Sequence, residues 1–147
     1  MIQNWSRYCV LQQFFNFPRK AFLILRESQG LYPTFKAETN NALYKLLKSQ
    51  NLVLRLNQSG ILSILEKTLY PTCVVLFGSA SRGEDTEESD IDLFIQAKQS
   101  KIDLSKFGKT LNRKINLLFE SDFKTVSPEL INNLANGVVL YGYFKVI

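Results

Sequence analysis

The sequence predicts an α+β protein whose first part is mainly helical and whose second part is built around strands. Before Pro71, apolar residues recur mostly at the three- and four-residue spacing of amphipathic helices. After Pro71, short apolar runs alternate with turn residues, which is the pattern of strands joined by loops and helices. Four strands are predicted in this second part, namely Cys73–Phe77, Asp90–Ile95, Lys114–Phe119 and Val138–Tyr141.

Residues 1–57 are expected to form a helix–hairpin–helix segment. The helical spacing of the first residues ends before Pro18. Two short strands, Phe22–Arg26 and Leu31–Ala37, flank Gln29-Gly30, a pair of residues typical of a hairpin turn. A second helix is predicted after Asn41. The apolar positions are Trp5, Tyr8, Leu11, Phe14 and Phe15 in the first helix, and Leu43, Leu46, Leu47 and Val53 in the second.

A further helix is predicted between Ser59 and Pro71, with apolar residues on one face. The Ser59 hydroxyl can accept a hydrogen bond from a free backbone N–H of the first turn, so Ser59 is the expected cap. Proline cannot continue a helix, so Pro71 ends it. Because the periodicity changes around this segment, the sequence is divided into an N-terminal segment, residues 1–57, and a larger domain, residues 58–147.

Composition limits the classes of function. The chain has 147 residues, of which 46% are hydrophobic and 21% charged, as in ordinary globular proteins. No apolar run approaches the roughly 18 residues of a membrane span, and the first residues lack signal-peptide features. Two cysteines without metal-site spacing favour a reducing, cytoplasmic location. The sequence contains no histidine, which excludes a histidine general base and a histidine-ligated zinc site in this chain.

The net charge of +5 is unevenly distributed. Residues 1–70 hold nine Lys/Arg and three Glu, a balance of +6, whereas residues 71–147 hold nine Lys/Arg and ten Asp/Glu, a balance of −1. A basic half beside a nearly neutral half suggests contact with an anionic partner, of which nucleic acid is one candidate. The alternative is a solvated, lysine-rich surface, since no basic cluster exceeds two residues in a row.

Asp90 and Asp92 are the main candidates for a metal site. Strand side chains alternate between faces, so both carboxylates point to one face, with Cβ atoms about 7 Å apart. Two unpaired carboxylates would repel each other, and a shared divalent cation removes the conflict. Hard oxygen ligands suit Mg²⁺, which usually also binds substrate phosphates, with Mn²⁺ as an alternative.

The turn after the first predicted strand is a candidate phosphate site. Gly78 lets the backbone approach a ligand closely, and Ser79 can start a short helix whose free N–H groups favour phosphate. Arg82 lies within reach as a second phosphate partner, and Gly83 permits the chain to turn away. The acidic stretch Glu84–Glu88 is then expected to be a solvent-exposed loop.

The run LFGSASRGEDTEESDIDLF carries both features, with ten residues between Gly78-Ser79 and Asp90-x-Asp92. It resembles the signature of the DNA polymerase β-like nucleotidyltransferase superfamily. Within that superfamily it resembles the minimal nucleotidyltransferases most. The resemblance implies a mixed sheet with helices on one face. It also implies transfer of a nucleoside monophosphate from a nucleoside triphosphate, with ATP the expected donor, to a protein, RNA or small-molecule acceptor. Some relatives of this type pair with HEPN proteins in toxin–antitoxin systems.

Asn116 departs from the family pattern. The resemblance implies a third carboxylate on a later strand, and the matching position in Lys114–Phe119 is Asn116. An amide oxygen can contact a metal, but an amide supplies no negative charge and takes no proton at neutral pH. Glu120 could substitute only if the backbone bends. Two hypotheses follow, an enzyme weakened at Asn116 and a catalytically impaired nucleotide-binding or antitoxin-like regulatory subunit.

The N-terminal segment resembles, loosely, the shortened winged-helix unit of archaeal relatives. Between Pro18 and Gly30 there is no room for both helices of a helix-turn-helix and a wing. A basic hairpin could contact nucleic-acid phosphates. The alternative is that these residues pack as a lid or a dimer interface. The basic residues of the hairpin are Arg19, Lys20, Arg26 and Lys36.

Overall fold

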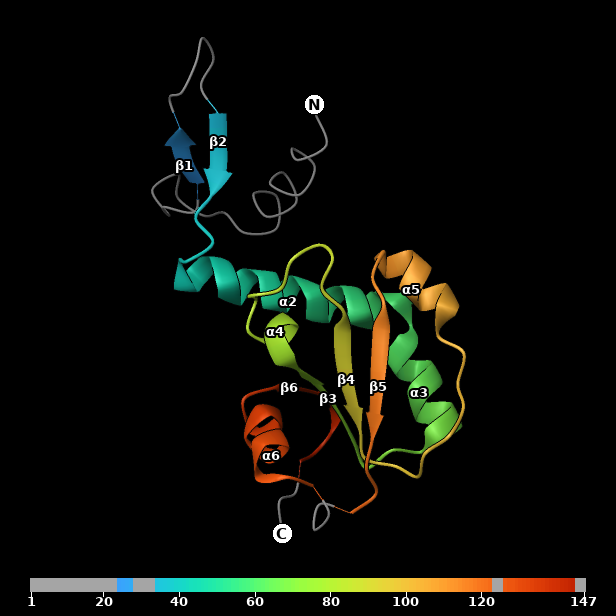
Figure 1. The fold of residues 1–147 in the computed structure, drawn as a ribbon. Helices are drawn as coiled ribbons and strands as arrows, with labels where there is room; N and C mark the ends of the chain where they lie inside the picture. The colour runs from blue at the N-terminus through green and yellow to red at the C-terminus, as the bar shows by residue number, and fades with distance from the viewer. Residues whose placement is uncertain (1–23, 28–33, 123–125, 145–147) are drawn as a thin grey trace. The chain divides into compact units, whose positions relative to one another are not determined.

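The computed structural model describes residues 24–27, 34–122 and 126–144, and it divides into two compact units, residues 1–41 and 42–147 (Figure 1). In the first unit, β1 (Ile24–Glu27) pairs antiparallel with β2 (Thr34–Ala37), which confirms the predicted hairpin. The predicted first helix and the basic residues Arg19 and Lys20 lie outside the described residues. The predicted division at residues 57 and 58 falls later than the boundary between the units, and it stays a prediction.

The second unit contains a four-stranded mixed sheet in the order β5-β4-β3-β6. β3 pairs antiparallel with both β4 and β6, whereas β4 and β5 are parallel. Parallel neighbours need a crossover connection, and α5 (Ser105–Leu111) lies in it. The sheet confirms the predicted α+β class and all four predicted strands within one residue at each end. Its strands are β3 (Cys73–Phe77), β4 (Ile91–Ile95), β5 (Ile115–Phe119) and β6 (Val138–Gly142).

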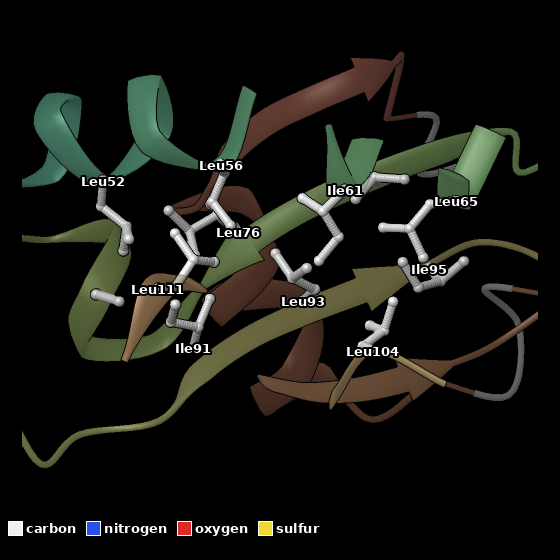
Figure 2. Packing of buried hydrophobic residues seen from close by; sticks show 12 residues of the cluster. Leu52, Leu56, Ile61, Leu65, Leu76, Ile91, Leu93, Ile95, Leu104 and Leu111 are labelled. Carbon is white, nitrogen blue, oxygen red and sulfur yellow. The ribbon is translucent and has the colours of Figure 1, made fainter. Parts of the chain in front are cut away.

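The main hydrophobic core lies between one face of the sheet and three helices, α2 (Ala42–Ser59), α3 (Ile61–Leu69) and α5. Alternate residues of β3 and β4 point toward these helices, as strand geometry requires. Figure 2 shows the leucine and isoleucine side chains that meet there. The buried cluster includes Leu52 and Leu56 from α2, Ile61 and Leu65 from α3, Leu111 from α5, and Val74, Leu76, Ile91, Leu93 and Ile95 from the strands.

The opposite face of the sheet is partly covered by α6 (Pro128–Ala135). Leu134 of α6 packs with Cys73, Val75 and Phe94, which come from the alternate positions of β3 and β4. Ser127 begins the helix, since its hydroxyl accepts a hydrogen bond from the Leu130 amide at 3.3 Å. The predicted arrangement with helices on one face therefore holds for α2, α3 and α5, while α6 lies on the other face.

The junction between α2 and α3 differs in detail from the prediction. α2 continues through Ser59, and Gly60 occupies the cap position of α3 with a left-handed φ of 81°. Glycine adopts this conformation without steric cost, so it suits a sharp change of helix direction. The Ser59 hydroxyl still accepts a hydrogen bond from the Ile61 amide at 3.3 Å. In the described ranges, no helix is long and apolar enough to span a membrane.

Candidate functional site

The turn between β3 and α4 (Gly78–Ser81) brings backbone against a carboxylate. Gly78 has a φ of 75°, and a Cβ atom added there would lie 3.0 Å from Oδ2 of Asp92. A larger residue would be strained by this backbone conformation and would crowd the carboxylate, so the position requires glycine. The structure thus places Gly78 beside Asp92, and the predicted binding of phosphate by Gly78 and Ser79 stays a prediction.

Asp90 and Asp92 lie on the face of the sheet that α2, α3 and α5 leave uncovered. Asp92 is inside β4, where it pairs with Phe77 of β3 on one side and with Asn116 of β5 on the other. Asp90 precedes the strand, which begins at Ile91 rather than at the predicted Asp90. The two carboxylates still point to one side, because a single amide contacts both of them.

Asn116 is the group that joins the two carboxylates. Its Nδ2 donates to Oδ2 of Asp90 and to Oδ1 of Asp92, each at 3.0 Å. These hydrogen bonds favour the ionised form of a carboxyl group. The Asn116 amide accordingly holds the pKa of Asp90 below its ordinary value, and the ammonium of Lys114, 3.4 Å from Oδ2 of Asp90, lowers this pKa further.

Arg82 follows α4 and is held by a neighbouring acidic residue. Its Nε donates to Oε2 of Glu84 at 2.8 Å, and Lys45 of α2 contacts Oε1 of the same carboxylate at 3.0 Å. Hydrogen bonds from Arg82 and Lys45 lower the pKa of Glu84. The Arg82 side chain is about half exposed, with 45% of its surface accessible. It could therefore leave Glu84 and contact another anionic group.

The family model "Polymerase beta, Nucleotidyltransferase" matches residues 59–143, which is more than half of the chain. The chain belongs to this nucleotidyltransferase family. The match includes Gly78, Ser79, Arg82, Asp90, Asp92 and Asn116, together with the four strands and most of the second compact unit. The α+β architecture predicted from the resemblance is therefore that of the family.

Solved structures give more distant similarities to this chain. One is a toxin–antitoxin structure with AMP-PNP, at 24% identity and a TM-score of 0.46, and another is a mutant of the toxin–antitoxin MntA-HpeT, at 21% identity and a TM-score of 0.45. Each similarity covers 60% of this chain and 75% of the other. A comparison with curated proteins gave no match.

The carboxylate pair offers oxygen ligands for a divalent cation. Oδ2 of Asp90 and Oδ1 of Asp92 both lie 3.0 Å from Nδ2 of Asn116, so a cation bound between the two carboxylates would take the place of this amide N–H donor. Oxygen atoms are the ligands that Mg²⁺ prefers, and Mg²⁺ completes its coordination with water and phosphate oxygens. The described part of the chain holds no group of three or more His, Cys, Asp or Glu suited to a metal. Glu120 lies four residues beyond Asn116, about 13 Å along an extended chain, and cannot complete a triad.

The loop between α4 and β4 contains a buried carboxylate, which corrects the prediction that Glu84–Glu88 is wholly exposed. Asp85 is only 7% exposed, whereas its neighbours Glu84, Thr86, Glu87 and Glu88 are exposed. Its carboxylate contacts Arg113 at 2.6 Å and Lys48 of α2 at 3.2 Å. Gly83 brings the loop against α2, since a Cβ atom there would overlap the Lys45 carbonyl oxygen.

These ionic partners had no local signal in the sequence. Asp85 lies 28 residues before Arg113 and 37 residues after Lys48, so no spacing rule connects them. Asp85 also sits among acidic residues of the kind normally found in a solvated loop. The one indication was Gly83, whose expected turn brings the following residue against the body of the domain.

Proposed function

We propose that the protein is a metal-dependent nucleotidyltransferase that moves a nucleoside monophosphate from a nucleoside triphosphate, ATP being the proposed donor, to an acceptor hydroxyl. The observation that carries this proposal is that the Asn116 amide contacts the carboxylates of both Asp90 and Asp92 at 3.0 Å, which brings the two carboxylates together beside the glycine turn that follows β3. Membership of the nucleotidyltransferase family supports the same reaction class. The acceptor class, whether protein, RNA or small molecule, is left to experiment.

Each site residue has a proposed role in that reaction. Asp90 and Asp92 would hold Mg²⁺, or Mn²⁺ in its place, through their carboxylate oxygens. When bound, the ion would neutralise charge on the triphosphate and favour departure of pyrophosphate. The backbone at Gly78 and the Ser79 hydroxyl would bind the β- and γ-phosphates, since the turn leaves no side chain in the way. Arg82 would leave its contact with Glu84 and make a charge-assisted hydrogen bond to phosphate instead.

A second candidate function is supported by Asn116. Its amide nitrogen donates to both carboxylates, in the position where a third carboxylate would add charge for a second cation. With two carboxylates and an amide, the site fits one cation, which favours nucleotide binding over rapid transfer. The alternative function is therefore a nucleotide-binding or antitoxin-like regulatory subunit with a HEPN-type protein partner.

Three further proposals concern the type of the domain, the role of the N-terminal segment and the location of the protein. The domain is proposed to be of the minimal nucleotidyltransferase type, because the run LFGSASRGEDTEESDIDLF lies inside the family match at residues 59–143. The N-terminal segment is proposed to be a shortened winged-helix unit that contacts nucleic acid through basic residues, of which Lys36 is exposed on β2. A cytoplasmic location follows from the need for nucleoside triphosphate.

The experiment that separates the two functions is incubation with ATP labelled at the α-phosphate, Mg²⁺ and candidate acceptors. Label transferred to any acceptor, lost in Asp92→Asn, supports the enzyme. Binding of ATP without transfer to any acceptor, in wild type and in Asn116→Asp alike, supports the regulatory subunit. Absence of both binding and transfer at millimolar ATP would contradict the shared part of the two proposals.

A further inference from the structure

Arg113 makes three hydrogen bonds around the residue that precedes β4. Its Nε donates to the Ser89 carbonyl oxygen at 2.7 Å, and one terminal nitrogen donates to the Asp90 carbonyl oxygen at 2.9 Å. The other terminal nitrogen donates to Oδ2 of Asp85 at 2.6 Å. The Arg113 side chain is only 9% exposed, so these contacts use its planar donor set in a nearly dry environment.

The two carboxylates of the site are held by different means. Asp92 lies in the middle strand pair of the sheet, with backbone partners on both sides, so the ladder fixes its main chain. Asp90 lies before the first residue of β4, and the Ile91 amide, which donates to the Lys114 carbonyl at 2.8 Å, marks the start of the pairing. The peptide group between Asp90 and Ile91 is therefore held on both sides, its N–H by the Lys114 carbonyl and its carbonyl by Arg113, so Arg113 adds the second contact that fixes the main chain of Asp90 ahead of the ladder.

Asp85 and Lys48 orient Arg113 in turn. Asp85 opposes the guanidinium with a side chain that is 5% exposed, and Lys48 contacts both the carboxylate and the backbone carbonyl of Asp85. A buried charge pair is stable only where its remaining hydrogen-bonding groups are satisfied, and here the guanidinium and the carboxylate satisfy each other. The chain of contacts runs from α2 through the loop to Asp90.

We propose that Arg113 is a positioning residue that sets where the Asp90 carboxylate lies, with Asp85 and Lys48 holding its guanidinium in place. This inference rests on the proposed function, because it assigns the placement of one of the two metal-binding carboxylates. It also means that the metal site depends on a helix, α2, that contributes no ligand.

The first test measures Mn²⁺ binding by electron paramagnetic resonance in the full chain. Arg113→Lys keeps the charge opposite Asp85 but loses the planar fork. Its Mn²⁺ affinity should fall about 10-fold, the size of effect expected for a residue that orients a ligand. Leu65→Ala is the control, because it removes a core side chain of α3 and should lower the melting temperature while leaving Mn²⁺ affinity unchanged.

The same substitution in two backgrounds shows whether Arg113 acts through Asp90. In an Asp90→Asn background, Arg113→Lys should cause no further loss of Mn²⁺ affinity, whereas in an Asp92→Asn background the loss should remain. Equal losses in both backgrounds would overturn the proposal. Asp85→Asn should lower Mn²⁺ affinity in the same direction as Arg113→Lys, and an unchanged affinity would contradict the role given to Asp85.

A second measurement needs no metal and so separates this inference from the proposed function. The Asn116 side-chain amide donates to Asp90, and its two proton signals in ¹⁵N–¹H spectra report that hydrogen bond. Arg113→Lys should move these signals in the direction that Asp90→Asn moves them, and Leu65→Ala should not. If wild type binds no Mn²⁺ but the signals move as expected, the metal site is wrong and the positioning stands. Signals that stay at their wild-type positions in Arg113→Lys would overturn the positioning.

Discussion

The two faces of the central strand pair contrast sharply in what holds them together. On one face, Ile91, Leu93 and Ile95 of β4 are fully buried under α2, α3 and α5 (Figure 2). On the other face, Asp92 and the preceding Asp90 are partly exposed, and hydrogen bonds from Asn116 hold their carboxylates. One face of β4 therefore carries apolar packing along its length, whereas the other carries the carboxylates near its start and Phe94, packed with Leu134, further along, because its side chains alternate.

The contrast separates two kinds of free energy. Burial of apolar side chains stabilises the fold without regard to metal or to the charge of the site. The carboxylate face is stabilised by ligands that neutralise its negative charge, and this stabilisation depends on pH. Substitutions on the first face should change the free energy of unfolding and spare ligand binding, whereas substitutions at the carboxylates and Asn116 should change ligand binding and make stability depend on metal and pH.

The largest effect is expected from Leu93→Ala, which leaves a cavity in the buried face. The free energy of unfolding should fall by about 3 kcal/mol, the usual cost of truncating a buried leucine. Chemical denaturation measures it. The Mn²⁺ affinity of the folded protein should change by less than about 2-fold, which is within the precision of a titration. This is expected even though Leu93 directly follows Asp92 in the sequence. A loss of Mn²⁺ affinity together with the loss of stability would contradict the claim that the two faces have separate roles.

The next effect concerns Asn116→Asp, which adds a carboxylate to the carboxylate face. Without metal, three carboxylates repel one another and two hydrogen bonds are lost, so the melting temperature should fall and then recover with Mg²⁺. Single-turnover transfer should accelerate by at least about 10-fold, a barrier change of about 1.4 kcal/mol. A slower Asn116→Asp enzyme would show that the amide is a working part of the site.

A smaller effect is expected in the titration of Asp90. Its pKa lies below the ordinary value, chiefly because Asn116 donates to it, so the folded state is favoured above the unfolded pKa. This contribution is lost as the pH falls through the folded pKa. Asn116→Ala should raise the pKa of Asp90 toward its ordinary value, as measured by carboxyl ¹³C NMR. Asp103, whose pKa is lowered by the Ser105 amide, is the internal control and should not move.

The smallest effect is expected from Glu84→Ala, at an exposed position in the loop after α4. Glu84 holds the Arg82 guanidinium, so its removal should free Arg82 for phosphate and tighten ATP binding by roughly 3-fold, the scale of an exposed ion pair. The melting temperature should barely change. Glu88→Ala, in the same loop and also exposed, is the matched control. Equal tightening in both variants would reflect net charge alone.

The features that could be predicted from the sequence are those carried by local patterns. Strand alternation predicted Asp90 and Asp92 on one side, and the structure shows one amide contacting both. The approach of Gly78 to a ligand stays a prediction, while its φ of 75° places it against the Asp92 carboxylate. Asn116 was expected opposite the pair, and the register of β4 and β5 places it there.

The remaining features depend on contacts between distant residues. The burial of Asp85 requires Lys48 and Arg113, which come from α2 and from the start of β5, and no local pattern distinguishes Asp85 from its exposed acidic neighbours. The position of α6 on the second face follows from Leu134 packing on Val75 and Phe94, since an amphipathic helix alone fits either face. Gly60 rather than Ser59 occupies the cap position of α3, because α2 continues through Ser59 and the left-handed conformation of Gly60 turns the chain between the two helices.

The most direct measurement of the central claim is the melting temperature of the full chain with ATP, with and without Mg²⁺. A ligand that binds only the folded state stabilises it, so Mg²⁺ with ATP should raise the melting temperature more than ATP alone. The Mg²⁺-dependent rise should vanish when Asp90→Asn and Asp92→Asn are combined. It should persist when Asp103→Asn and Glu129→Gln are combined, which removes the same charge away from the site. A Mg²⁺-dependent rise that survives loss of Asp90 and Asp92, or its absence from wild type at millimolar ATP, would contradict the assignment of these carboxylates to a metal–nucleotide site.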